Sequence, residues 1–286
     1  MSKRSEILSK LDSITDLPTL PDVMAKLNKI LEDVNCGVMD IVKVLESDPA
    51  IAVQILKTVN SPLFATCGAK ITSLQNAISR LGFREVKNIA LSTSVFEMMN
   101  GVKSHSFDRK EFFRYCLATS LGAAEIAVLK KDPRNFRVDE LHLAGLVHGM
   151  GKMILDSYFP ELFQECLAIA KEKDLPLFDV EREHLGIDHC ELGAIVSGKW
   201  KLPLSAVNAI KYSANPSEAP DNIKPAIMAV HLASFIANSE KLGYSGEVCP
   251  IICEGTLKTL DMNIQDFEAV KEQVLAKEEE MAASLG

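Results

Sequence analysis

Three histidines and one lysine have the residue types and spacing of a binding site: His148 and Lys152 in "HGMGK", and His184 and His189 in "EREHLGIDHC". Imidazole nitrogens are common ligands of transition metals, and a lysine ammonium can hold an anion. Histidines on facing helices can therefore build a metal site in an all-helical protein. A partly buried histidine that hydrogen-bonds a neighbour is the more common arrangement. These four residues thus mark a candidate ligand-binding cleft without establishing a metal.

The stretch "HGMGK" stands inside an otherwise apolar segment, "LHLAGLVHGMGKMIL". Glycine weakens a helix, and lysine is seldom fully buried. A local violation of this kind is typical of a functional site. We therefore expect the helix predicted over 138–157 to carry the centre of the cleft.

Helical spacing of apolar residues runs along most of the chain, as in Val38, Ile41, Val42 and Leu45, and no strand-length window alternates strictly. The pattern predicts an all-α protein, a multi-helix bundle in two lobes. A hinge is expected at 100–110, because this segment is rich in glycine, serine and histidine. The predicted lobes are 1–102 and 103–286.

A helix is also expected over 247–260, where Cys249 and Cys253 are four residues apart and would share a face. Two thiols without further ligands make a poor zinc site, so both are expected to be small buried apolar residues. Cys190 follows His189 directly. Adjacent helix positions point in different directions, so this pair does not predict a nucleophile and its base.

Composition and charge exclude several classes of protein. The chain has 286 residues, 47% of them hydrophobic, and a net charge of −8 with no run of Lys or Arg. Binding to nucleic acid is therefore not expected, and no apolar run reaches the roughly 18 residues of a membrane span. The N-terminus lacks an apolar signal-peptide core, and the seven cysteines contain no CxxC pair. These features predict a cytoplasmic protein with reduced thiols.

A series of segments then recurs in an order and spacing that is similar to a known family: "LPTLPDVMAKLNKI", "VLESDPAIAVQILKTVNSPLF", "ITSLQNAISRLGFREVKNIAL", "FFRYCLATSLGAAEIA", "HLAGLVHGMGKMIL" and "EREHLGIDHCELGAIVSGKWKLP". Over about 17–234 the chain resembles the HDOD family, bacterial signalling relatives of the HD superfamily of metal-dependent phosphohydrolases. The resemblance implies that the C-terminal lobe has an HD-like helical fold.

Catalytic members of that superfamily hold a metal with a histidine, a His-Asp pair and a later aspartate. By the resemblance, Tyr115 stands at the first position, Gly149 follows His148 in the pair, and Ser234 stands at the last. Relatives also carry a His-His pair where this chain has Ser213 and Ala214. The resemblance therefore implies a degenerate member with no catalytic residue, no metal and no cofactor, although Lys152 matches the family's lysine.

The resulting hypothesis is a non-enzymatic signalling and regulatory domain that acts by binding a protein or a small ligand. The alternative is a divergent metal-dependent phosphohydrolase with a site built from His148, His184 and His189. A third hypothesis is a nucleotide or anion receptor at His148 and Lys152. Relatives are often joined to receiver, kinase or cyclic-dinucleotide turnover domains, so proteins of these kinds are the expected partners.

Overall fold

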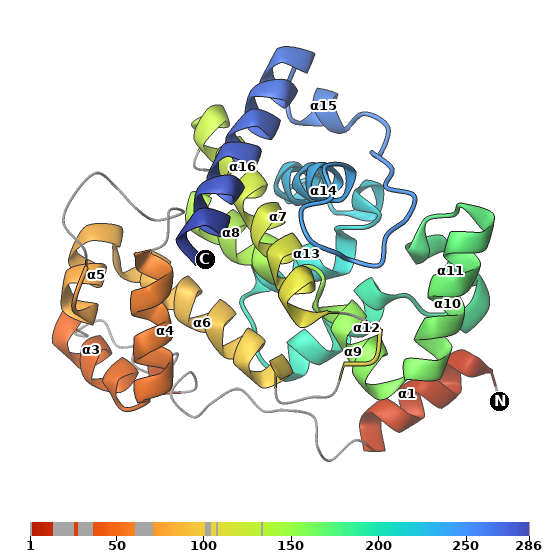
Figure 1. Ribbon diagram of the computed structural model, residues 1–286, viewed down its shortest axis with the longest axis horizontal. Coiled ribbons are helices and arrows are strands. Elements are labelled where there is room, and N and C mark those ends of the chain that lie inside the picture. Colours follow the sequence, from red (N-terminus) through yellow and green to blue (C-terminus); the bar gives the residue numbers. More distant parts are fainter. Residues whose placement is uncertain are drawn as a thin grey trace. The chain divides into compact units, whose positions relative to one another are not determined.

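Helices make up the computed structural model of the chain (Figure 1), which describes residues 2–13, 26–27, 37–60, 71–100, 104–106, 108–132 and 134–285. These residues contain no β-strand, which agrees with the all-α prediction. Of the helix predicted over 21–34, all but Lys26 and Leu27 lies outside the described residues.

The chain divides into two compact units, one made of Met1–Leu17 with Val102–Val274 and the other of Pro18–Gly101 with Leu275–Gly286. The predicted lobe 103–286 differs from this division at its C-terminal end, because Leu275–Gly286 belongs to the smaller unit. The predicted lobe 1–102 differs at its N-terminal end, because α1 (Lys3–Ser13) belongs to the larger unit. Its polar side chains explain the difference. Arg4 makes a two-pronged ion pair with Glu191, and Lys3 lies 2.8 Å from the Nε2 atom of His184.

Within the described residues, the smaller unit contains the helices α3 (Val38–Glu46), α4 (Pro49–Val59), α5 (Leu74–Leu81) and α6 (Phe83–Asn100) and the end of α16 (Ile264–Leu285). The apolar stripe predicted at Ile41, Val42 and Leu45 is buried, whereas Val38 is exposed in the first turn of its helix. Ser73 caps α5 by accepting a hydrogen bond from the Asn76 backbone N–H, as expected of a serine at a helix start. This unit is a packed helical core.

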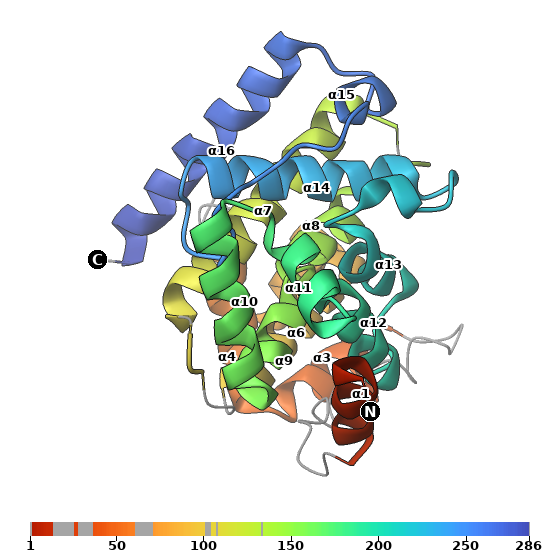
Figure 2. The same ribbon diagram turned by 90° about the vertical axis from the view of Figure 1, so that its right-hand side faces the viewer.

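The larger unit contains, after α1, the helices α7 (Arg109–Lys130), α8 (Val138–Val147), α9 (Met150–Tyr158), α10 (Pro160–Lys173), α11 (Leu177–Leu185), α12 (His189–Lys199), α13 (Leu204–Tyr212), η1 (Pro216–Glu218), α14 (Lys224–Ser239) and α15 (Thr256–Thr259), and the start of α16 (Ile264–Leu285). Helix α7 packs on α8 and α14, which crosses it in Figure 2. Among the described residues, α7 alone has the length and composition to cross a membrane, and 67% of its most apolar window is buried in the protein.

The helix predicted over 138–157 is in fact two helices. α8 ends at Val147, a turn at His148 and Gly149 follows, and α9 starts at Met150. Next to this turn, Gly151 lies against the backbone of α12, so closely that an added Cβ atom would overlap the carbonyl oxygen of His189. The glycines of "HGMGK" therefore break the helix and let two helices touch through their backbones.

The helix predicted over 247–260 is wrong except at its end, since only Thr256–Thr259 is helical. Pro250 has no backbone N–H to donate within a helix. Gly255, with a positive φ of 77°, is the residue that precedes α15. The residues between α14 and α15 form an irregular segment, 240–255, whose middle lines the pocket described next.

Candidate functional site

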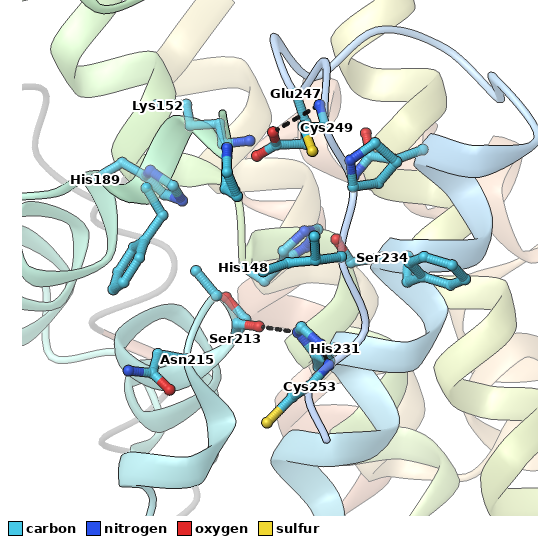
Figure 3. A pocket seen from close by; sticks show the side chains of 18 of the residues that line it. His148, Lys152, His189, Ser213, Asn215, His231, Ser234, Glu247, Cys249 and Cys253 are labelled. Atoms are coloured by element: carbon cyan, nitrogen blue, oxygen red, sulfur yellow. Dashed lines mark hydrogen bonds between the residues drawn. The ribbon is translucent and has the colours of Figure 1, made fainter. Parts of the chain in front are cut away.

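A cavity of about 250 Å³ lies in the larger unit (Figure 3). Helix α7, the α8–α9 turn, α9, α11, α12, the segment after α13, α14 and segment 240–255 all contribute to its wall. Its lining residues are Tyr115, His148, Gly149, Lys152, Pro176, Phe178, Asp179, His189, Ser213, Ala214, Asn215, His231, Ser234, Phe235, Asn238, Glu247, Cys249, Pro250, Ile251 and Cys253. We call this cavity the central pocket.

Tyr115, His148 and Ser234 form a continuous hydrogen-bonded chain in the central pocket. The Nδ1 atom of His148 lies 2.7 Å from the Gly145 carbonyl, which can only accept, so Nδ1 carries the proton. Nε2 therefore accepts from the Tyr115 hydroxyl at 2.7 Å, and the Ser234 hydroxyl, 2.8 Å from the Tyr115 oxygen, donates to it. Three of the four positions that the family resemblance pointed to as ligand positions are thus hydrogen-bonded together, and the fourth, Gly149, lines the same pocket.

The electrostatics of His148 agree with this arrangement. Burial, together with the smaller effect of the nearby positive charges of Lys152 and His189, lowers the pKa of its imidazole to about 3. Burial also raises the pKa of the Tyr115 hydroxyl far above its ordinary value. At neutral pH the ring is therefore uncharged and the phenol keeps its proton, so the hydrogen-bonded chain persists over the physiological range.

Lys152 is a buried cation, with 4% of the residue exposed. Its ammonium group donates to the carbonyl of Ser245 at 3.1 Å and lies 5.9 Å from the centre of the Tyr115 ring. No carboxylate of the described residues lies within ion-pair distance of it. A buried ammonium with one hydrogen bond keeps donors for a ligand, since it carries three.

His189 is held by a carboxylate that the sequence did not point to. The Oε2 atom of Glu181 accepts from both the Nδ1 atom of His189, at 2.6 Å, and the backbone N–H of His189, at 2.8 Å. Glu181 is fully buried. Burial is the largest single influence on the pKa of His189 and lowers it, but the Glu181 carboxylate and the neighbouring Cys190 together raise that pKa to about 10. His189 is therefore an imidazolium at neutral pH.

His184 lies outside the central pocket. Its Nε2 atom is 2.9 Å from Glu165 and 2.8 Å from the ammonium of Lys3, at a partly exposed junction of α1, α10 and α11. The set of His148, His184 and His189 that was predicted as a rearranged metal site is therefore not brought together. The described residues contain no group of three or more His, Cys, Asp or Glu placed to hold a metal ion.

His231, which the sequence analysis did not single out, fixes segment 240–255 to the pocket wall. Its Nδ1 donates to the Ser213 carbonyl at 2.7 Å, and its Nε2 accepts from the backbone N–H of Cys253 at 2.9 Å. Burial lowers its pKa, so the ring is neutral. Cys249 and Cys253 are half-buried on this irregular segment, where they line the pocket and share no helix face.

The other end of the segment is held against α7 through Gly243. This residue has a φ of 81°, and an added Cβ atom there would overlap the Glu111 carbonyl oxygen and the Tyr115 backbone nitrogen. The next residue, Tyr244, donates its N–H to the Glu111 carbonyl at 3.0 Å. The segment therefore reaches the pocket through a contact that only glycine fits.

Gly243→Ala is expected to loosen segment 240–255 and to lower the stability of the protein. Gly255→Ala is the matched control, because Gly255 also has a positive φ but has no atom within 4 Å of an added Cβ. Both variants carry the backbone strain of about 1 kcal/mol or more, and only Gly243→Ala adds the overpacking cost of roughly 1–3 kcal/mol. Urea unfolding of the two variants measures the difference, and equal losses would contradict the close contact.

A family model described as the HDOD domain matches residues 17–216. The chain is 26% identical over 224 residues to an uncharacterized protein of Treponema pallidum (strain Nichols), a match that covers 78% of this chain and 42% of that protein. It thus spans less than half the length of that curated relative.

Solved structures show the same fold. A candidate phosphohydrolase from Shewanella amazonensis SB2B is similar with a TM-score of 0.72 and 19% identity, covering 95% of this chain and 97% of that one. A candidate signal transduction protein from Marinobacter aquaeolei VT8 is similar with a TM-score of 0.71 and 22% identity, covering 95% of this chain and 61% of that one.

Proposed function

Since the chain belongs to the HDOD family, we propose that it is a non-enzymatic signalling domain whose central pocket binds a small ligand. The observation that carries the proposal is the hydrogen-bonded chain of Tyr115, His148 and Ser234. The lone pair of His148 Nε2, which could bind a metal, accepts a hydrogen bond from the Tyr115 hydroxyl instead. A cavity of about 250 Å³ remains beside this network, so the site keeps room for a ligand.

Signalling by such a domain needs a bound state that differs from the free one. Segment 240–255 suits this role, because its backbone is bonded directly to two pocket residues, Lys152 and His231. A ligand that draws Lys152 away from the Ser245 carbonyl would loosen the segment. Exposed apolar side chains at Val248, Ile251 and Ile252 would then present a changed surface to a partner protein.

The competing function is metal-dependent phosphoester hydrolysis. The similar Shewanella protein is named as a candidate phosphohydrolase. Two of the three histidines needed, His148 and His189, do line the pocket. Each has one ring nitrogen committed, since Nδ1 of His148 donates to Gly145 and Nδ1 of His189 pairs with Glu181. The charge of His189 also disfavours metal binding, because a ligating imidazole must be neutral.

A triple variant, Tyr115→His, Gly149→Asp and Ser234→Asp, tests the proposal by rebuilding the ligand set that the family resemblance implies. We expect the native protein, purified without chelator, to carry far less than one manganese, iron or zinc per chain. We expect the triple variant to bind metal, although a Cβ atom added at Gly149 would stand 3.0 Å from the Phe112 ring and require a small shift. Elemental mass spectrometry at known protein concentration gives the metal content.

Hydrolysis of bis(4-nitrophenyl) phosphate by the native protein and by His148→Ala completes the test. The proposed function predicts no turnover above buffer for either. Turnover by the native protein that disappears in His148→Ala would establish the enzyme instead. A native protein that carries one metal per chain would contradict the proposal in the same way.

A further inference from the structure

The central pocket contains two cationic donors that the hydrogen-bonded chain of Tyr115 does not use. Lys152 spends one donor on Ser245, and His189 spends Nδ1 on Glu181, which leaves the Nε2–H of the imidazolium on the pocket side. Figure 3 shows the two side chains on the same side of the cavity. They come from α9 and α12, whose backbones touch at Gly151 and His189. These helices therefore hold the two donors in a fixed relation.

We propose that Lys152 and His189 form an anion subsite, and that the ligand is a small organic molecule carrying one oxyanionic group, a carboxylate or a phosphate monoester. This inference rests on the receptor role proposed above and names its ligand class. Two charged donors that converge on one anion give charge-assisted hydrogen bonds, which are roughly twice as strong as neutral ones.

The charge distribution of the rest of the pocket supports an anion at its floor. The positive charges of Lys152 and His189 both act on His148, so this part of the pocket is electropositive. The lining also contains two carboxylates, and the charge of one of them, Glu247, acts on Tyr115. Glu247 accepts the backbone N–H groups of Leu177 and Cys249, and Asp179 is exposed at the rim.

The same distribution limits the charge and size of the ligand. Acidic groups at the rim repel a second anionic group, so one oxyanion is favoured over a polyphosphate. The cavity volume of about 250 Å³ is smaller than that of typical pockets for drug-sized ligands, which is roughly 300 Å³ or more. The ligand is therefore expected to be small. Phe178, Phe235, Pro250 and Ile251 supply apolar surface for the organic part of the molecule.

Glu181 acts in this subsite as a positioning residue. The buried carboxylate of Glu181 favours the protonated form of His189. The Oε1 atom of Glu181 has no hydrogen-bond partner among the described residues, so the carboxylate bonds to His189 through Oε2 alone. The other groups that face the His189 ring are His148 from the α8–α9 turn, Lys152 from α9, and Cys190 from its own helix, with Asp179 and Glu247 across the pocket.

Removal of the Glu181 charge is expected to change the pKa of His189 from above its ordinary value to below it. In the native protein the pKa of His189 is about 10, so the donor is present below that pH and is lost as the pH rises through it. In Glu181→Gln the contribution of the carboxylate is lost, and burial, the largest influence on this pKa, lowers it. The ring becomes neutral near pH 7. The amide oxygen of the introduced glutamine can accept from Nδ1–H, which leaves Nε2 as an acceptor that repels an anion.

The experiment compares benzoate and phenyl phosphate with benzyl alcohol, their uncharged counterpart, by calorimetry from pH 6 to 9. The native protein is expected to bind at least one of the two anions at least tenfold more tightly than the alcohol, with little change over this pH range. Glu181→Gln and Lys152→Met are expected to lose tenfold or more of that affinity at pH 8. The loss in Glu181→Gln should shrink as the pH falls.

Glu165→Gln is the matched control, because Glu165 forms the same kind of carboxylate–histidine pair with His184 outside the pocket. This variant should bind the anions as the native protein does. If Glu181→Gln does not fold, the protonation of His189 in the native protein is measured by NMR on labelled histidine. An imidazolium at pH 8 supports the subsite, and a neutral ring at pH 7 overturns it.

The outcomes separate the subsite from the proposed function. Equal binding of the alcohol and the anions, or binding of neither anion, contradicts the subsite and leaves a non-enzymatic receptor for another ligand class. Turnover of phenyl phosphate contradicts the non-enzymatic function and supports the anion subsite. Benzoate binding without phenyl phosphate binding identifies a carboxylate ligand, and the reverse identifies a phosphate monoester.

Discussion

Gly151→Ala is expected to destabilise the larger unit more than any other single methyl group added to the residues discussed above. The new Cβ atom would overlap the carbonyl oxygen of His189 and would lie 2.7 Å from its carbonyl carbon and 3.1 Å from the backbone nitrogen of Gly193. All three atoms belong to the backbone of α12. They cannot rotate away as the end of a side chain can, so α9 and α12 must separate.

The cost lies at or beyond the upper end of the roughly 1–3 kcal/mol that overpacking usually carries, because a whole helix has to shift. Gly198→Ala is the matched control. Gly198 is also a glycine of α12, but nothing lies within 4 Å of an added Cβ, and alanine there should stabilise the helix by about 0.5–1 kcal/mol. Thermal unfolding followed by circular dichroism shows whether Gly151→Ala lowers the stability and whether Gly198→Ala raises it.

The same variant has a functional consequence, because Lys152 and His189 flank the crossing. Separation of α9 from α12 moves the two proposed anion donors apart, so any Gly151→Ala protein that still folds should bind benzoate or phenyl phosphate weakly. Native stability in Gly151→Ala would show that the two helices do not touch as described. If Gly151→Ala keeps the native stability but loses anion binding, the substitution alters the pocket without separating the two helices.

Residue types and spacing could predict where the site lies along the chain, but only some of the residues that form it. His148, Lys152 and His189 were selected for their residue types and spacing, and all three line the central pocket. His184 satisfied the same criteria and lies elsewhere, because the turn at Gly186 separates the direction of α11 from that of α12. Sequence spacing does not determine orientation across such a turn.

Glu181 and His231 could not be found in this way. Glu181 stands eight residues before His189, on another helix, and a glutamate on an amphipathic helix normally faces solvent. His231 sits inside an apolar run of α14, where it resembles an ordinary core residue. What distinguishes both residues is burial with specific partners, which depends on the tertiary fold.

The fold itself followed from apolar periodicity wherever a helix packs one face on a core, as at Ile41 and Leu45 or along Leu74, Ala77 and Ile78. Periodicity failed over 247–260, because the apolar residues there serve a different purpose. Cys249 and Cys253 are four residues apart, as on one helix face, but both line the pocket from an irregular segment. The glycines at 243, 246 and 255, each with a positive φ, were the signal against a helix.

Asp156→Ala is expected to release the segment that precedes α7 from the larger unit. Asp156 is fully buried at the C-terminal part of α9. Its carboxylate accepts the Ser104 hydroxyl at 2.6 Å and the backbone N–H groups of His105 and Ser106 at 2.9 and 2.7 Å. Hydrogen bonds to a charged group are worth about 1.5–3 kcal/mol each, and burial keeps water from replacing them completely. The expected loss is therefore roughly 3–5 kcal/mol, which is the range for breaking a buried charged interaction.

Asp108→Ala provides the comparison that isolates burial, because Asp108 also accepts two backbone N–H groups, from Lys110 and Glu111, but does so in solvent at the start of α7. Loss of this exposed cap should cost only about 1 kcal/mol. Urea unfolding gives both free energies, and hydrogen exchange at the amides of His105 and Ser106 reports whether the segment has come loose. Equal losses would mean that water substitutes for the Asp156 carboxylate. A large loss confined to Asp156→Ala, with faster exchange at those amides, would show that the chain just outside α7 is anchored from α9, the helix that also carries Lys152.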